Sequence, residues 1–199
     1  MTAPEPLSTA LPALSPADRR ELLRLARASV RAAVRGEAAP AESVLSTALR
    51  EPGAAFVSLH QDRRLRGCVG TLVADRPLHD TVARMARAAA LDDPRFAPLA
   101  EAELDGVDIE ISRLSPLVPA VADQVLPGHH GVSLRCGEHR GVFLPQVATV
   151  YNWDRETLLT ELCYKAQLPA DAWMRPGIDL MVFTAEVFGE NDVAAGVSE

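Results

Sequence analysis

The sequence predicts an α+β fold with a largely antiparallel or mixed sheet and flanking helices. Segments with strand-like alternation come in hairpin pairs separated by helical segments, and no repeated strand, helix, strand unit is present. The 199 residues are 48% hydrophobic and 24% charged, as in a globular chain with a sizeable core. One compact unit or two small subdomains fits this length. We expect residues 1–14 to be loose and 191–199 to form a frayed tail.

The first helix is predicted over residues 18–35. Ser15, followed by Pro16 and by Asp18 three positions on, indicates a capped start, and Gly36 indicates the end. Five arginines line the side opposite the apolar one: Arg20, Arg24, Arg27, Arg31 and Arg35. Such a stripe is typical of a solvated helix face, with phosphate binding as the alternative. Because the chain carries a formal charge of −7, we expect no nucleic-acid partner.

The next elements are a hairpin, a helix and a strand. Residues 54–60 and 65–73 flank a polar turn and predict the hairpin, and a helix is expected over 77–91, before Asp93-Pro94. Residues 107–112 alternate apolar and polar side chains, as a half-buried strand does. Its polar face carries Asp108, Glu110 and Ser112.

The last third of the chain repeats this mixture. Residues 131–136 and 140–144 predict a second hairpin around Gly137. Asp154 is the expected N-cap of the following helix, and residues 180–188 predict one final strand.

The segment Leu65–Thr71, which reads LRGCVGT, is the most informative stretch. Strand alternation predicts Leu65 and Val69 on one face, and Arg66 and Cys68 on the other. A guanidinium near the thiol favours the nucleophilic thiolate. The alternative is that Cys68 is a small buried core residue.

A catalytic thiol needs a base and an orienting group. The candidate bases are His60, His129 and His130, and Glu110 is a candidate orienting carboxylate or an ordinary solvent-facing glutamate. Without HxH, HExxH or CxxC spacing we expect no metal, and without a P-loop, GxGxxG or GxSxG motif we expect no cofactor. Three cysteines without CxxC spacing indicate reduced thiols, so we expect a cytoplasmic protein with no membrane partner.

Leu65–Thr71 resembles the LRGCIG signature of the AMME syndrome candidate gene one (AMMECR) domain family, known in prokaryotes as AmmeMemoRadiSam system protein A. Further family motifs resemble segments that follow in the same order: Asp93–Phe96, Ile109–Ser112, Leu114–Pro116, His130–Gly131, Leu144–Ala148, Trp153–Asp154, Cys163–Ala166 and Leu168–Pro169. Gln167 stands where the family has glycine, at a helix end that favours the left-handed conformation.

The resemblance implies a single AMMECR-type domain over residues 15–190, built from two closely packed subdomains with the LRGCxG strand at a cleft. It implies a bacterial protein that works with Memo-like and radical S-adenosylmethionine (SAM) proteins, and it assigns no biochemical activity. The residues that it implies for binding are Arg66, Gly67, Gly70, Thr71 and Gln146.

Two functional hypotheses follow. In the first, the chain is an enzyme or enzyme component in which Cys68 is the nucleophile, Arg66 favours its thiolate, His130 is the base and Glu110 orients. In the second, it is a non-catalytic adaptor that binds a small molecule, a peptide or the partner proteins, and the LRGCxG signature serves packing and backbone geometry.

Overall fold

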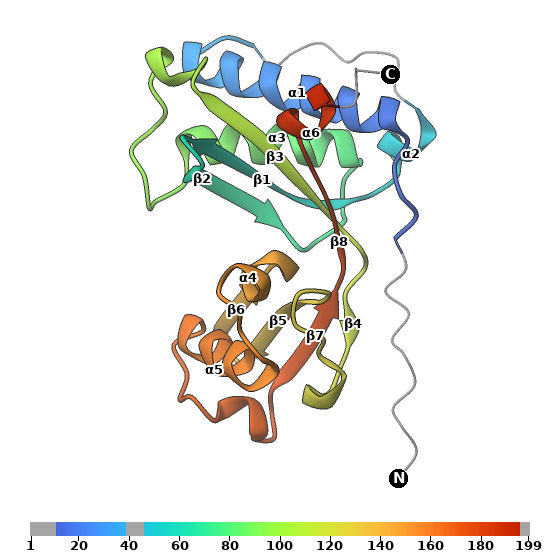
Figure 1. Cartoon of the computed structure of the whole chain (residues 1–199), viewed down its shortest axis with the longest axis vertical. Coiled ribbons are helices and arrows are strands. Elements are labelled where there is room, and N and C mark those ends of the chain that lie inside the picture. Colours follow the sequence, from blue (N-terminus) through green and yellow to red (C-terminus); the bar gives the residue numbers. More distant parts are fainter. Residues whose placement is uncertain (1–10, 39–45, 196–199) are drawn as a thin grey trace. The chain divides into compact units, whose positions relative to one another are not determined.

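The computed structural model describes residues 11–38 and 46–195, which form two compact units (Figure 1). Unit 1 contains Ser115–Ala185, and unit 2 contains Pro12–Leu114 together with the chain from Glu186 onward. Each unit combines helices with one four-stranded sheet, and neighbouring strands of each sheet pair antiparallel. The predicted α+β class is therefore confirmed.

Unit 2 is a sheet with the strand order β2-β1-β3-β8 and two long helices. Its strands are β1 (Ala54–Gln61), β2 (Arg64–Thr71), β3 (Val107–Leu114) and β8 (Ala185–Gly189). Its helices are α1 (Pro16–Arg35), α2 (Thr47–Arg50), α3 (Leu78–Leu91), the 3₁₀ turn η1 (Glu101–Glu103) and α6 (Glu190–Ala195). Buried side chains of α1 and α3 share a core with Val57, Leu59 and Ile111 of the sheet, so both helices cover the same sheet face.

Helix α1 ends where the sequence predicts and begins two residues earlier, at Pro16, directly after the predicted Ser15 cap. The Asp18 N–H donates to Ser15 Oγ at 3.1 Å, and Pro16 occupies the first turn, where its missing N–H costs nothing. Gly36 ends the helix with a left-handed φ of 68°.

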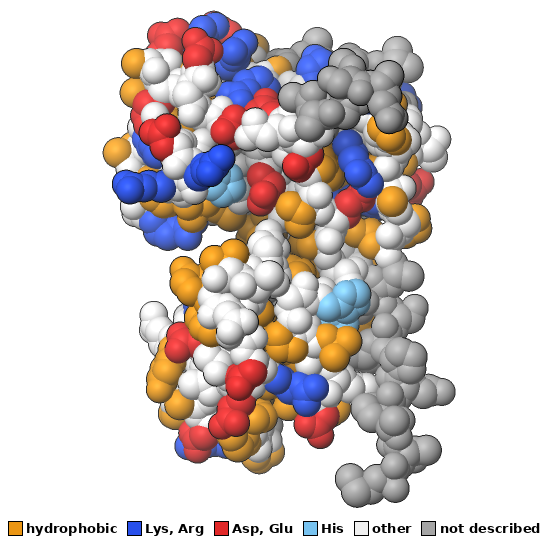
Figure 2. All heavy atoms as spheres, in the orientation of Figure 1, with side chains coloured by type: hydrophobic (Ala, Val, Ile, Leu, Met, Phe, Trp, Pro, Cys, Tyr) orange, Lys and Arg blue, Asp and Glu red, His pale blue; other side chains and the backbone are white. Residues whose placement is uncertain are grey.

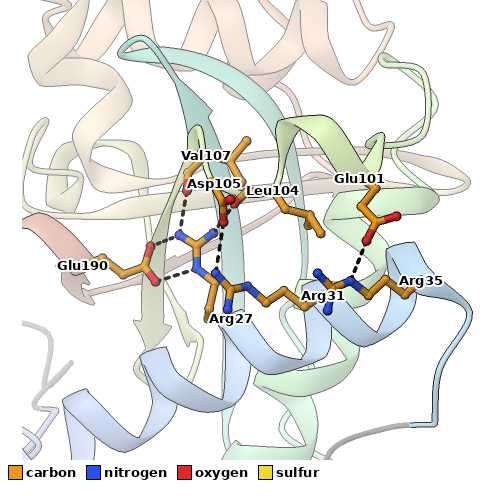
Figure 3. A network of polar contacts seen from close by, with 8 residues as sticks. All are labelled: Arg27, Arg31, Arg35, Glu101, Leu104, Asp105, Val107 and Glu190. Carbon is orange, nitrogen blue, oxygen red and sulfur yellow. Dashed lines mark hydrogen bonds and ion pairs between the residues drawn. The ribbon is translucent and has the colours of Figure 1, made fainter.

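The arginines of α1 are mostly paired with acidic groups (Figure 3). Arg27 donates to the carbonyls of Leu104 and Val107 at 2.9 and 2.6 Å and forms an ion pair with Glu190. Arg31 pairs with Asp105, Arg35 with Glu101 and Arg24 with Glu21. Only 20% of the Arg27 side chain is exposed, so the prediction of a solvated face is wrong at that position. Figure 2 shows basic and acidic side chains interspersed on the visible face of unit 2.

Unit 1 has the strand order β4-β7-β5-β6. Its elements are β4 (Val118–Pro119), η2 (Ala122–Gln124), β5 (Gly131–Cys136), β6 (His139–Phe143), α4 (Pro145–Val150), α5 (Arg155–Lys165), η3 (Ala172–Met174) and β7 (Asp179–Phe183). The hairpin and the Asp154 cap are both confirmed, since β5 pairs with β6 and the Thr157 N–H donates to Asp154 Oδ1 at 2.8 Å. Gln167 adopts the left-handed φ of 59° that glycine takes more easily.

The predicted final strand is two strands. The chain leaves β7 at Thr184, whose N–H donates to Ser115 Oγ and whose carbonyl accepts from the Ser115 N–H, both at 2.9 Å. It then continues as β8 in the sheet of unit 2. The apolar run that the sequence predicts as one strand is therefore two strands, one in each sheet, and the chain is fixed between them by the hydrogen bonds of Thr184 to Ser115.

The described residues near each end of the chain are more ordered than the sequence predicts. Residues 1–10 and 196–199 lie outside the described residues, but Leu14 is buried and its N–H donates to Glu186 at 3.0 Å. Helix α6 occupies the start of the segment that we predicted to fray. Among the described residues, no helix combines the length and apolarity needed to cross a bilayer.

Candidate thiol site

Cys68 lies in a row of side chains that crosses three strands of unit 2. It is opposite Ser58 on β1, and Ser58 is opposite Glu110 on β3. Directly opposed side chains share a face, with Cβ atoms about 4.5–5.5 Å apart. The neighbouring β1 residues Val57 and Leu59 face the helices, so Cys68, Ser58 and Glu110 lie on the other face. We call this the thiol face.

A break in strand register creates this row. Leu59 pairs with Gly67 but His60 pairs with Leu65, which leaves Arg66 as the extra residue of a bulge. Leu65, opposite His60, therefore falls on the side of Ser58. The prediction that Leu65 and Val69 share a face is wrong, because the bulge interrupts the alternation at Arg66.

The thiol itself contacts a hydroxyl group. Ser58 Oγ lies 3.3 Å from Cys68 Sγ, within the range of a hydrogen bond that involves sulfur. Ser58 is 6% exposed, whereas Cys68 is only partly buried. The Ser58 hydroxyl can therefore donate to a sulfur atom that is not enclosed in the core.

Both backbone polar groups of Cys68, its N–H and its carbonyl, form hydrogen bonds to side chains. Its N–H donates to Asp93 Oδ2 at 2.8 Å, and its carbonyl accepts from Arg95 Nη2 at 3.0 Å. Strand β2 is an edge strand, and edge strands leave such groups unpaired. Asp93 and Arg95 supply the acceptor and donor that a neighbouring strand supplies within a sheet. We call this pair the Asp93–Arg95 clip.

Asp93 is a buried carboxylate fixed by the same arginine. Its side chain is 3% exposed and accepts from Arg95 Nε at 2.9 Å and from Arg95 Nη2 at 2.7 Å. Hydrogen bonding from Arg95 holds the pKa of Asp93 well below its usual range, against the opposing effect of burial. Asp93 in turn raises the pKa of Arg95, and attraction to a Cys68 thiolate adds to that rise. Arg95 is therefore a permanent cation beside the thiol.

The Arg66 guanidinium binds groups of the chain that precede β3. Its Nε and Nη2 bind the two carboxylate oxygens of Glu103 at 2.8 and 3.0 Å, and its Nη1 donates to the Ala97 carbonyl at 2.9 Å. The Arg66 hydrogen bond is the main cause of the lowered pKa of Glu103. Arg66 thus ties β2 to the loop before β3, and its guanidinium is engaged there. That it favours the Cys68 thiolate stays a prediction.

The glycines of the signature permit close packing. A Cβ on Gly67 would lie 2.2 Å from the Ala89 carbonyl oxygen of α3, and one on Gly70 would lie 2.1 Å from the Phe56 ring. Thr71 Oγ1 accepts from the Val73 N–H at 3.0 Å and closes the turn that follows β2. These residues form internal contacts, and their roles in ligand binding stay predictions.

His130 and Gln146 belong to unit 1, so the structure does not bring them together with Cys68 and Glu110 within one unit. His130 is 5% exposed, and its Nδ1 accepts from the Leu126 N–H at 3.2 Å. Burial, with a further contribution from His129, lowers the pKa of His130 and favours a neutral ring. The catalytic role of His130 and the binding role of Gln146 stay predictions. Among the described residues, no three His, Cys, Asp or Glu side chains gather in a way that suits a metal ion.

Sequence reasoning gave no role to Ser58, Asp93 or Arg95. The Asp93–Phe96 motif was itself a signal for two of them, since it is one of the segments that resemble the family. Ser58 has no comparable signal, because its position opposite Cys68 depends on the bulge at Arg66.

The fold and the site define a class of α+β protein in which an LRGC strand carries a thiol and a DPR loop holds that strand's edge. The chain belongs to the AMMECR1 family, whose sequence profile matches residues 23–188. A protein of Thermococcus onnurineus strain NA1 is 36% identical over 181 residues, covering 85% of this chain and 88% of that protein. Protein TK0174 of Thermococcus kodakarensis is 37% identical over 182 residues, with coverage of 85% and 88%.

A solved structure has the same fold. The crystal structure of uncharacterized protein PH0010 from Pyrococcus horikoshii matches with a TM-score of 0.79 and 33% identity, and covers 85% of this chain and 90% of that one. These relatives are archaeal and do not bear out the expectation of a bacterial protein.

Proposed function

We propose that the chain is an enzyme, or an enzyme component of an AmmeMemoRadiSam-type system, in which Cys68 is the nucleophile. The observation that carries the proposal is the Ser58–Cys68 hydrogen-bond contact on a strand whose backbone is clipped at Cys68 itself. A sulfur atom held in this way keeps one position relative to a substrate, and such positioning is one of the contributions to covalent catalysis.

The proposed step is attack by the Cys68 sulfur on an electrophilic carbon. The thiol first loses its proton to a base, the sulfur–carbon bond forms, and the bond from that carbon to its leaving group breaks with its electron pair. The Ser58 hydroxyl and the Arg95 cation stabilise the negative sulfur. Glu110, in the same row, is the candidate base or orienting group, and His130 is the predicted alternative base.

Alkylation of the native chain by iodoacetamide tests the proposal. We expect Cys68 to react at least about tenfold faster than the buried Cys163, and Ser58→Ala to slow Cys68 by about fivefold, the effect of one lost hydrogen bond. Peptide mass spectrometry assigns the modified residue, and Cys68→Ser confirms the assignment. Cys68 that stays unmodified in the folded chain contradicts the nucleophile role.

A second candidate function is a non-catalytic adaptor. One observation favours it: Arg66, Gly67, Gly70 and Thr71 all make internal contacts, as a signature needed for packing does. The adaptor would bind an unidentified small molecule or peptide, or the Memo-like and radical SAM proteins that family association suggests. We place either function in the cytoplasm and include no nucleic-acid or membrane partner.

Cys68→Ser separates the two functions in cells that depend on this gene. The substitution removes the nucleophile but preserves the size of the side chain and a hydroxyl donor, so the fold is retained. If Cys68 is catalytic, we expect the Cys68→Ser chain to fail to support these cells. Full retention, together with unchanged co-purification of a co-expressed Memo-like or radical SAM partner, supports the adaptor instead.

A further inference from the structure

Arg95 has hydrogen-bond donors that the clip does not use. Its Nε binds Asp93, and its Nη2 binds Asp93 and the Cys68 carbonyl, which occupies three N–H groups. A guanidinium has five N–H groups, and the two on Nη1 have no acceptor among the described residues. The Arg95 side chain is 55% exposed, whereas Asp93 is 3% exposed. An anion in solution therefore meets the guanidinium and not the buried carboxylate.

The clip fixes where those donors lie relative to the thiol. Arg95 contacts Cys68 on the outer edge of β2, while Ser58 and Glu110 lie across β1 and β3 on the other side. A second acid of the thiol face, Asp108, is on β3 opposite His60. Charge across the site is therefore graded, from a cation at the β2 edge to carboxylates two strands away.

We propose that the Cys68 site takes a small electrophile that carries a carboxylate, bound by Arg95 Nη1 while its electrophilic carbon faces the sulfur. This inference rests on the proposed function, and it adds the substrate class and the residue that recognises it. Asp93 orients Arg95 by its paired hydrogen bonds, so the donor pair is held in place before a ligand arrives.

Iodoacetate and iodoacetamide provide a matched pair of probes. Both react by the same step: the Cys68 thiolate attacks the methylene carbon, the S–C bond forms, and iodide leaves with the electron pair of the C–I bond. The thiol proton goes to the buffer. The reagents differ in that iodoacetate carries a carboxylate where iodoacetamide carries a neutral amide, so their rate ratio at Cys68 measures recognition of the carboxylate.

We expect Arg95→Gln to lower the iodoacetate-to-iodoacetamide ratio at Cys68 by about three- to tenfold, as for loss of one charged hydrogen bond at a partly exposed site. Arg20→Gln is the control. Arg20 is exposed and lies on α1, and its substitution removes the same charge as Arg95→Gln. In the unmodified chain, 1 M NaCl should lower the ratio in the same direction by screening. This second measurement does not depend on the folding of any variant.

The outcomes separate the two proposals. Reaction of Cys68 with both reagents at a ratio that neither salt nor Arg95→Gln changes overturns the carboxylate subsite and leaves the nucleophile in place. Absence of reaction with either reagent overturns the nucleophile and the subsite together. An equal fall of the ratio in Arg20→Gln shows a general charge effect and also overturns the subsite.

Discussion

Gly67→Ala is expected to destabilise unit 2 by about 3 kcal/mol, near the upper end of overpacking effects in protein cores. The added Cβ meets the Ala89 carbonyl oxygen at 2.2 Å, and this oxygen belongs to the backbone of α3. A flexible side chain can rotate away from such a contact, but a helix carbonyl moves only with its helix. Either α3 separates from β2 or β2 shifts from its register with β1.

Urea denaturation followed by circular dichroism measures this effect, with Gly106→Ala as the matched control. Gly106 lies between η1 and β3, its φ is not positive, and the nearest atoms to an added Cβ are 3.6 Å away. We expect the control to change stability by no more than about 0.5 kcal/mol. A Gly67→Ala chain as stable as the Gly106→Ala chain contradicts the packing of β2 on α3 described above.

This result also bears on how the signature is interpreted. Loss of function in a Gly67 variant is expected whether Cys68 is catalytic or structural, since the substitution displaces the strand that carries the thiol. Cys68→Ser and Ser58→Ala change side chains of the thiol face without adding volume. They are therefore the substitutions that distinguish chemistry from packing at this strand.

The sequence predicted elements well where the signal is local. The Ser15 cap, the Asp154 cap and the first hairpin depend on residues a few positions apart, and all three are observed. The segment 180–188 was predicted as a single strand, because an apolar run does not indicate which sheet each part of it joins. The structure divides it between β7 and β8. The break at Thr184 arises from hydrogen bonds to Ser115, 69 positions away.

The site was predicted less completely for the same physical reason. With an unbroken hairpin, the pairing of His60 with Leu65 would set Ser58 opposite Gly67, and the bulge at Arg66 shifts Ser58 to Cys68 instead. An arginine within a strand segment does not predict a bulge, so the sequence did not indicate this one. Asp93 reaches Cys68 only because α3 returns the chain to the edge of β2, which periodicity cannot show.

Arg95→Met is expected to destabilise the chain by about 3 kcal/mol at neutral pH. It leaves Asp93 as a buried carboxylate without its cation, and breaking one partner of a buried pair costs about 3–5 kcal/mol. We take the lower end because Arg95 is 55% exposed, so water can replace part of its contact. Methionine preserves the length and apolar stem of the side chain, which limits the loss of packing.

The pH dependence of stability gives this prediction its sharpest form. In the unmodified chain the folded pKa of Asp93 is depressed, so its contribution is present above the ordinary carboxyl range and is lost as pH falls through the folded pKa. In Arg95→Met the hydrogen bonds from the guanidinium are gone, so the opposing effect of burial weighs more against the N–H groups of Cys68 and residue 95, which still donate to Asp93, and the folded pKa of Asp93 is higher than in the unmodified chain. Its protonation then relieves the buried charge, so acidification from neutral pH towards pH 4 should reduce the stability difference between the two chains.

Urea unfolding of both chains at several pH values between about 4 and 7 measures that difference, and the double variant Asp93→Asn, Arg95→Met is the control. A neutral amide at position 93 has no proton to gain, so the double variant should lack the relief seen in Arg95→Met. A stability difference that stays constant or grows on acidification contradicts the Asp93–Arg95 clip as the electrostatic support of the Cys68 strand. The unfolded pKa of Asp93 is the same in both chains, so the sign of the change depends on whether the folded variant binds a proton at Asp93 more readily than the folded unmodified chain.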